Sequence, residues 1–113
     1  MCGITIFISK THRNIITDIL KSLVQIQNRG YDSVGIALKS EKWDIYKYAS
    51  TDNIDGIDKL SKRIKNISST MAIGHTRWAT HGAKNDINSH PHISMSGNII
   101  LVHNGIITNF QEI

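Results

Sequence analysis

The sequence is poor in cysteine, proline and aromatic residues: one Cys, one Pro and 6% Phe, Trp and Tyr among 113 residues. A single cysteine excludes an internal disulfide framework of the kind that stabilises small secreted domains. No apolar run approaches the roughly 18–20 residues of a membrane-spanning helix. The first residues also lack the charged-then-apolar order of a secretory signal. We therefore expect a cytoplasmic protein without membrane contact.

Charge of one sign is not concentrated anywhere along the chain. The 13 Lys and Arg residues against 9 Asp and Glu give a net charge of +4, and only Lys62, Arg63 and Lys65 cluster. A surface that follows a phosphate backbone needs dense positive charge with stacking aromatic residues beside it. We therefore expect no nucleic-acid partner. The 40% apolar content can support the core of one small domain, or of part of a larger one. The sequence leaves open whether the protein forms a homo-oligomer.

Hydrophobic periodicity predicts two helices and about five strands. Apolar residues recur at helical spacing over residues 15–28 and 54–67, and short β-branched or alternating runs predict strands. Gly30 stands where it would end the first helix. The expected strands are 3–8, 33–38, 43–48, 71–75 and 98–103, with a polar turn at 10–13 and a hairpin joining the second and third strands.

This order of elements predicts an α+β fold in which helices cover a sheet. Residues 109–113 resemble the first turn of a further helix. We therefore expect the fold to be incomplete within this chain, with strand edges and apolar faces that further segments would cover.

The only cysteine, Cys2, follows the initiator Met1 directly. If Met1 is removed, Cys2 carries a thiol and a free α-amine on the same carbon, and an α-amine titrates close enough to neutral pH to take the thiol proton. A nucleophile and its base would then lie in one residue. The alternative is a small buried side chain at the start of a strand, because free cysteines are often buried and inert.

Three polar blocks lie at the ends of predicted elements, where a rigid scaffold presents functional groups. Residues 28–33 form the first block, which on its own resembles a solvated turn. In the second, residues 74–82, Arg77 could bind a carboxylate through two hydrogen bonds and Trp78 could shield the site from water. In the third, residues 103–105, the Asn104 amide and the Gly105 backbone N–H are donors of the kinds that form an oxyanion hole.

Five of the six histidines fall between His75 and His103, including the pair His90 and His92 around Pro91. A zinc or iron site is one interpretation of this spacing. Asp86 is the only carboxylate in the stretch, and the chain has no second cysteine. We therefore expect no bound metal.

These motifs occur together and in order, and together they resemble one known family. The chain resembles, from residue 1 to 113, the N-terminal portion of the glutaminase domain of glutamine–fructose-6-phosphate aminotransferases, which are class II, N-terminal-nucleophile amidotransferases. The segment before Arg-Gly-Tyr-Asp-Ser departs from the family at Asn28, where a Tyr is usual. The motifs are Cys2-Gly3-Ile4, Arg29-Gly30-Tyr31-Asp32-Ser33, Gly74-His75-Thr76-Arg77-Trp78-Ala79-Thr80-His81-Gly82, His90-Pro91-His92 and His103-Asn104-Gly105-Ile106-Ile107.

The resemblance implies a role for each matching residue and a fold. Cys2 would attack the glutamine side-chain amide to form a thioester, with its own α-amine as the base, and Asn104 and Gly105 would stabilise the oxyanion. Arg77 would bind the α-carboxylate of glutamine. Trp78, Thr80 and His81 would line and close the glutamine loop, and Arg29 would position the cysteine. The implied fold is a four-layer α/β/β/α sandwich of the N-terminal-nucleophile hydrolases, and no cofactor is implied.

The resemblance also implies partners outside this chain. L-glutamine would be the substrate here, whereas fructose 6-phosphate would be converted to glucosamine 6-phosphate by an isomerase domain or a partner chain that the sequence does not contain. The family's aspartate for the glutamine α-amine also lies beyond the third block, outside this chain. Two other hypotheses stay open: a catalytically silent binding module of glutaminase type, and a metal-dependent hydrolase that uses the histidines from His75 to His103.

Overall fold

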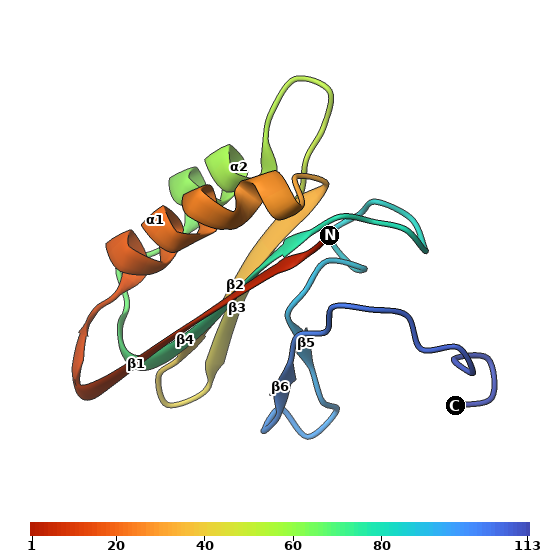
Figure 1. The fold of residues 1–113 in the computed structure, drawn as a ribbon. Helices are drawn as coiled ribbons and strands as arrows, with labels where there is room; N and C mark the ends of the chain where they lie inside the picture. Colours follow the sequence, from red (N-terminus) through yellow and green to blue (C-terminus); the bar gives the residue numbers. More distant parts are fainter.

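A computed structural model describes residues 1–113, and its largest element is a four-stranded antiparallel sheet (Figure 1). The strand order is β1-β4-β2-β3, so the N-terminal strand lies at one edge. β2 is central and almost completely buried, as its small and β-branched residues require. The strands are β1 (Gly3–Asn14), β2 (Ser33–Lys39), β3 (Trp43–Ala49) and β4 (Ser68–Arg77).

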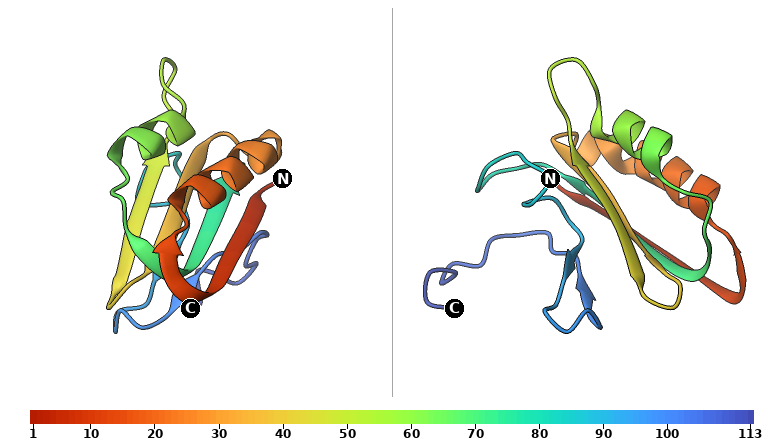
Figure 2. Two further views of the ribbon diagram at one scale, coloured as in Figure 1. Left: turned by 90° about the vertical axis from the view of Figure 1, so that its left-hand side faces the viewer. Right: turned by 180° about the vertical axis from the view of Figure 1, so that it is seen from behind.

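Two helices, α1 (Ile16–Ile26) and α2 (Gly56–Arg63), cover one face of this sheet (Figure 2). Asp55 begins α2 by accepting a hydrogen bond from the Ile57 N–H at 2.9 Å, an N-cap that satisfies a free helical donor. Each fully buried aliphatic side chain between these layers contributes about 1.5–3 kcal/mol. The core consists of Ile15, Ile16, Ile19, Leu23, Val34, Ile36, Leu38, Ile57, Leu60 and Ala72.

The first helix ends at Ile26, two residues before the expected residue 28, and Gly30 ends the helical run as predicted. A 3₁₀ turn, η1 (Gln27–Arg29), follows α1, and the Gly30 N–H closes it on the Gln27 carbonyl at 2.9 Å. A Cβ at position 30 would lie 2.6 Å from the backbone nitrogen of Trp78. Only glycine lets this turn approach the end of β4 so closely.

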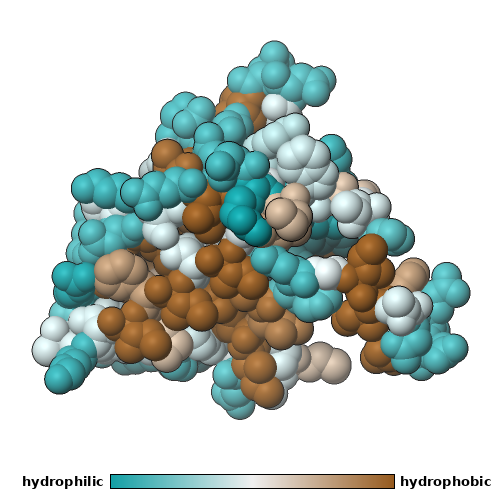
Figure 3. Space-filling model, viewed as in Figure 1, coloured by the Kyte–Doolittle hydropathy of each residue, from teal (hydrophilic) through white to brown (hydrophobic).

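A small hairpin of β5 (His92–Ile93) and β6 (Ile100–Leu101) lies on the other face of the sheet (Figure 2). It covers only part of that face. Along β1, the side chains of Ile4, Ile6 and Ile8 remain 40%, 58% and 71% exposed. Figure 3 shows hydrophobic surface across the lower middle of the molecule.

Three expectations about the elements were wrong in detail, and one strand was missed. The predicted turn at residues 10–13 is part of β1, which continues to Asn14 through a break in its register with β4. An irregularity of this kind accommodates extra residues in one strand without ending that strand. The second helix ends at Arg63 because Ile64 is already extended, and the last predicted strand shortens to β6. β5 was not predicted.

Residues 109–113 do not begin a helix. They form isolated turns, and Phe110 and Ile113 are 59% and 88% exposed. A single turn without a partner to pack against does not repay the cost of helix nucleation. The fold class is α+β, as predicted, with antiparallel strands in both sheets. The structure contains no helix with the length and apolar character that crossing a membrane requires.

Candidate active site

The start of β1 and the end of β4 lie side by side, because Gly3 pairs with Thr76 across the sheet. The segment after β6 passes the same end, and together these parts enclose a cavity of about 430 Å³. This volume is typical of a small-molecule site. All eight residues singled out from the sequence line it: Cys2, Arg29, Arg77, Trp78, Thr80, His81, Asn104 and Gly105.

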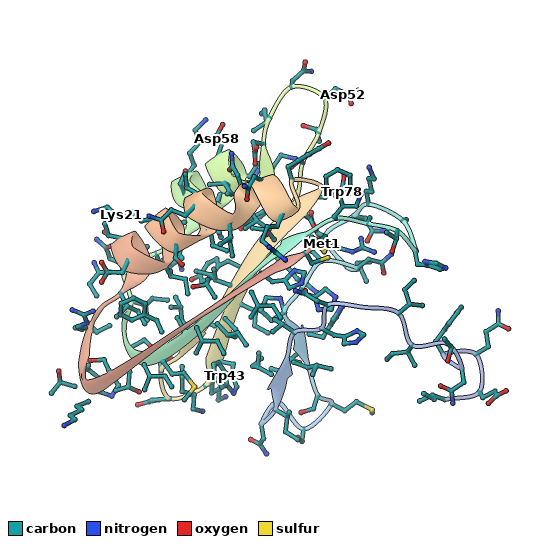
Figure 4. The ribbon with its side chains drawn as sticks, viewed as in Figure 1. Met1, Lys21, Trp43, Asp52, Asp58 and Trp78 are labelled. Carbon is teal, nitrogen blue, oxygen red and sulfur yellow. The ribbon has the colours of Figure 1, made fainter.

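The Cys2 side chain faces the first residue of the loop that follows β4. The Trp78 backbone N–H donates to Cys2 Sγ at 3.3 Å, and the thiol lies 3.7 Å from the Trp78 carbonyl oxygen. Figure 4 shows Met1 and Trp78 close together at this end of the sheet. Met1 is 80% exposed and also lines the cavity. Its removal would therefore expose the α-amine of Cys2 at the edge of the cavity without disturbing the core.

Two side chains hold the backbone carbonyl oxygen of Cys2. Asn104 Nδ2 donates to it at 3.0 Å and Arg29 Nε donates at 3.4 Å. A side-chain amide carries two hydrogens on nitrogen, so Asn104 keeps one donor for a ligand. Gly105, the next residue, has a φ of 141°, in a region that side chains other than glycine rarely adopt.

Arg77 is 9% exposed and supports the loop after β4, whose residues Trp78, Thr80 and His81 line the cavity. One terminal nitrogen donates to the Ala83 carbonyl at 3.1 Å and the other to the His81 carbonyl at 2.6 Å. A guanidinium has five N–H donors, so three remain after these two contacts. Arg77 can therefore hold the loop and bind a carboxylate at the same time.

Asp32 fixes the same loop from the opposite side, a role that the sequence did not reveal. Its carboxylate accepts from the Ala79 N–H at 2.6 Å and lies 2.7 Å from Lys84 Nζ. Burial alone would raise the pKa of Asp32, but the hydrogen bonds from Lys84 and Ala79 and the charge of Arg77 outweigh it and hold this pKa below its ordinary value. The only sequence signal was its place beside Arg29 in the first polar block.

We expect Asp32→Ala to lower the free energy of unfolding by about 2–3 kcal/mol, because it removes a charged acceptor and leaves the Ala79 N–H without a partner. Lys84→Ala is the matched control: the Lys84 side chain is 60% exposed, and surface ion pairs contribute less than about 1 kcal/mol. Urea denaturation measures both. Equal effects of the two substitutions would show that Asp32 does not anchor the loop.

The histidines form a stack rather than a set of ligands. The His75 and His90 rings lie 4.5 Å apart at 32°, and the His90 and His92 rings lie 4.4 Å apart at 74°. The structure contains no group of three or more His, Cys, Asp or Glu side chains placed to hold a metal ion. The hypothesis of a metal-dependent hydrolase therefore lacks a ligand set.

Burial keeps two of these histidines neutral. Desolvation lowers the pKa of His75 to about 4, although its hydrogen bond with Asn104 opposes the shift, and lowers the pKa of His90 to about 3. Neighbouring positive charge, including that of Arg77, acts in the same direction as desolvation. Nδ1 of each ring is buried and has no hydrogen-bond partner. Protonation of either ring would therefore place a buried Nδ1–H without an acceptor inside the protein.

This neutrality predicts that acid destabilises the fold. The pKa of His75 is 6.5 in an unfolded chain and about 4 here, so its stabilisation is complete above pH 6.5 and disappears as the pH falls toward 4. The expected loss from His75 alone is about 2 kcal/mol at pH 5. Urea unfolding at pH 7.5 and pH 5 measures it, and His75→Gln should flatten the dependence. A free energy of unfolding that does not change between these values would contradict the prediction.

No family model matches the chain. Individual proteins do match it over its whole length. A protein of Acanthamoeba polyphaga mimivirus named "probable glutamine–fructose-6-phosphate aminotransferase [isomerizing]" is 43% identical over 115 residues. The enzymes named glutamine–fructose-6-phosphate aminotransferase from Pyrococcus horikoshii and Sulfolobus acidocaldarius are 45% and 42% identical, and each alignment covers 100% of this chain.

The chain matches the glutaminase domain of these aminotransferases. The resemblance predicted from the motifs is thereby confirmed. The chain spans only about a fifth of the length of the relatives, since the alignments cover 19%, 18% and 19% of the three proteins named above. Asn28, the position at which a departure from the family was expected, lies outside the lining of the cavity.

Proposed function

We propose that residues 1–113 are the N-terminal portion of a class II glutaminase domain, which releases ammonia from the side-chain amide of L-glutamine. The observation that supports this proposal most strongly is the cavity, which brings the Cys2 thiol together with the donors of Asn104 and Arg77. A nucleophile, an oxyanion donor and a carboxylate-binding cation are the parts that this hydrolysis needs. No cofactor is required, because the thiol and the α-amine supply nucleophile and base.

The first step is the attack of Cys2 on the amide carbon of glutamine. With Met1 removed, the α-amine takes the thiol proton, and sulfur forms a bond to the amide carbon while the carbonyl electrons move to oxygen. The free Nδ2 hydrogen of Asn104 and the Gly105 N–H stabilise this oxyanion. The protonated amine then returns its proton to the leaving nitrogen. Ammonia departs, and a thioester remains on Cys2.

The second step repeats this chemistry with water. Water attacks the thioester, the amine again accepts and returns a proton, and glutamate leaves the regenerated thiol. Arg77 holds the α-carboxylate through the donors that the loop carbonyls leave free. Trp78, Thr80 and His81 line the loop side of the cavity and limit the entry of water. Arg29 positions Cys2 by donating a hydrogen bond from Nε to the Cys2 carbonyl oxygen.

In the whole protein, we propose that the ammonia serves the conversion of fructose 6-phosphate to glucosamine 6-phosphate. The names and lengths of the relatives support this: they are isomerizing aminotransferases, and this chain matches about a fifth of each. The sugar-phosphate chemistry would belong to a further domain or a partner chain. A cytoplasmic location suits an enzyme whose nucleophile must remain a free thiol.

The exposed isoleucines of β1 support the proposal of an α/β/β/α sandwich in the whole protein. Ile4, Ile6 and Ile8 alternate along β1 with Thr5, which bonds to Ser22 of α1, and Phe7, which packs against the core. The three isoleucines therefore lie on the opposite face of the sheet, where a second sheet would pack. Sheets in such sandwiches pack about 10 Å apart through alternating apolar side chains. The β5–β6 hairpin already lies on this face, and we propose that it belongs to the second sheet.

The experiment that tests this function is an assay of ammonia release by the purified protein at its natural length. We expect turnover of L-glutamine, and at most slow turnover of L-asparagine, whose amide carbon lies one methylene closer to the α-carboxylate that Arg77 binds. Calorimetry on the same samples measures glutamine binding. Binding without ammonia release, from folded protein that lacks Met1, would instead support the catalytically silent module.

A further inference from the structure

We propose that His75 is a positioning residue that holds the Asn104 side-chain amide in the orientation an oxyanion donor needs. This inference rests on the proposed glutaminase function. His75 lies on β4 and is fully buried, with Nε2 2.9 Å from Asn104 Oδ1. Asn104 is exposed, and its side chain has two hydrogen bonds, one to His75 and one to the Cys2 carbonyl. His75 therefore controls one of the only two contacts that orient this amide.

The direction of each hydrogen bond follows from the chemistry of the Cys2 carbonyl. A carbonyl oxygen only accepts, so the Asn104 edge that faces it is the NH₂ group. The amide oxygen then faces His75, and an amide oxygen also only accepts. His75 Nε2 must therefore carry the hydrogen. Without that hydrogen, only the hydrogen bond to the Cys2 carbonyl would orient the amide, and its oxygen would lose its one partner.

The surroundings of His75 fix its ring and its tautomer. Ile4 of β1 and Gly35 of β2 are its cross-strand neighbours, and the His90 ring lies against it at 4.5 Å. The titratable and charged groups around it are His90 just before β5, His92 in β5, His103 after β6, and Arg77 on its own strand. Burial lowers its pKa to about 4, so the ring is neutral at pH 7 and its single hydrogen is committed to Asn104.

Two substitutions separate this hydrogen bond from simple packing. His75→Gln keeps an N–H donor near the position of Nε2, whereas His75→Leu fills similar space without a donor. We expect His75→Leu to lower kcat by about 10- to 100-fold, because a misplaced catalytic group costs up to about 100-fold. KM should change less than about threefold, and His75→Gln should restore most of kcat. His12→Leu, at an exposed histidine of β1, is the control and should leave kcat unchanged.

Two further measurements separate the failure of this inference from the failure of the proposed function. The rate of Cys2 alkylation by iodoacetamide should stay the same in His75→Leu, which shows that the thiol keeps its reactivity. The Asn104 side-chain NH₂ resonances should shift and lose protection from exchange in His75→Leu, but not in His75→Gln. These resonances report the contact even if the protein releases no ammonia. Unchanged Asn104 resonances, or an unchanged kcat in His75→Leu of an active protein, would overturn the proposal.

Discussion

Replacement of Cys2 by alanine is expected to reduce ammonia release from glutamine by at least about 10⁴-fold, because losing the nucleophile of a covalent mechanism removes most of the rate enhancement. Cys2 is the only thiol in the chain, and it lies at the cavity wall with the Trp78 N–H directed at its sulfur. Alanine is also small, so removal of Met1 should continue and the α-amine should stay in place. The substitution therefore tests the thiol alone.

Two controls accompany this substitution. Urea denaturation should give the same midpoint for Cys2→Ala and the unchanged protein, because Cys2 is only partly buried and lies outside the core. Glutamine binding by calorimetry should also persist, since Arg77 and the loop residues remain. Ammonia release within tenfold of the unchanged protein would show that another group carries the reaction.

We expect Asn104→Ala to lower kcat by about 10²- to 10³-fold, which is the usual cost of one oxyanion-hole donor. Asn104 Nδ2 donates one hydrogen to the Cys2 carbonyl at 3.0 Å, so its second hydrogen lies close to Cys2, the residue whose sulfur reacts. Because the negative charge develops only during the reaction, KM for glutamine should change little. Steady-state ammonia release measures both constants.

The matched control for Asn104 is Asn53→Ala, at an exposed asparagine that lies outside the cavity. This variant should keep both kcat and KM. A different pattern would count against the assigned role. If Asn104→Ala raised KM and left kcat unchanged, Asn104 would serve glutamine binding rather than the transition state.

The sequence predicted the parts of the fold that depend on strong local patterns. The β2–β3 hairpin agrees within one residue at each strand end, because alternation and a short polar turn are both local signals. The first helix ends at Ile26, two residues before the expected end, but Gly30 ends the 3₁₀ turn that follows it. The polar run at residues 10–13 was misleading, since turn-forming residues also suit a bulge. β5 has only two residues, and pairing with β6 rather than local preference holds it in place.

The sequence likewise predicted which residues meet, but not how they are held. The motifs near positions 2, 77 and 104 line one cavity although up to 102 positions separate them. The hydrogen bonds that hold these residues in place left no local pattern in the sequence. Asp32 bonds to a loop backbone 47 positions away, and His75 meets Asn104 across 29. Such contacts depend on tertiary register, which only the folded chain defines.

The most direct test of the central claim, that Cys2 is an N-terminal nucleophile, is mass spectrometry of the protein after treatment with an electrophilic analogue of glutamine. We expect Met1 to be absent and the N-terminal peptide to begin at Cys2, with one label on its sulfur. Excess glutamine should slow the labelling, because both molecules occupy the cavity lined by Arg77 and Asn104. Native protein that keeps Met1, or a label on any other residue, would contradict the claim.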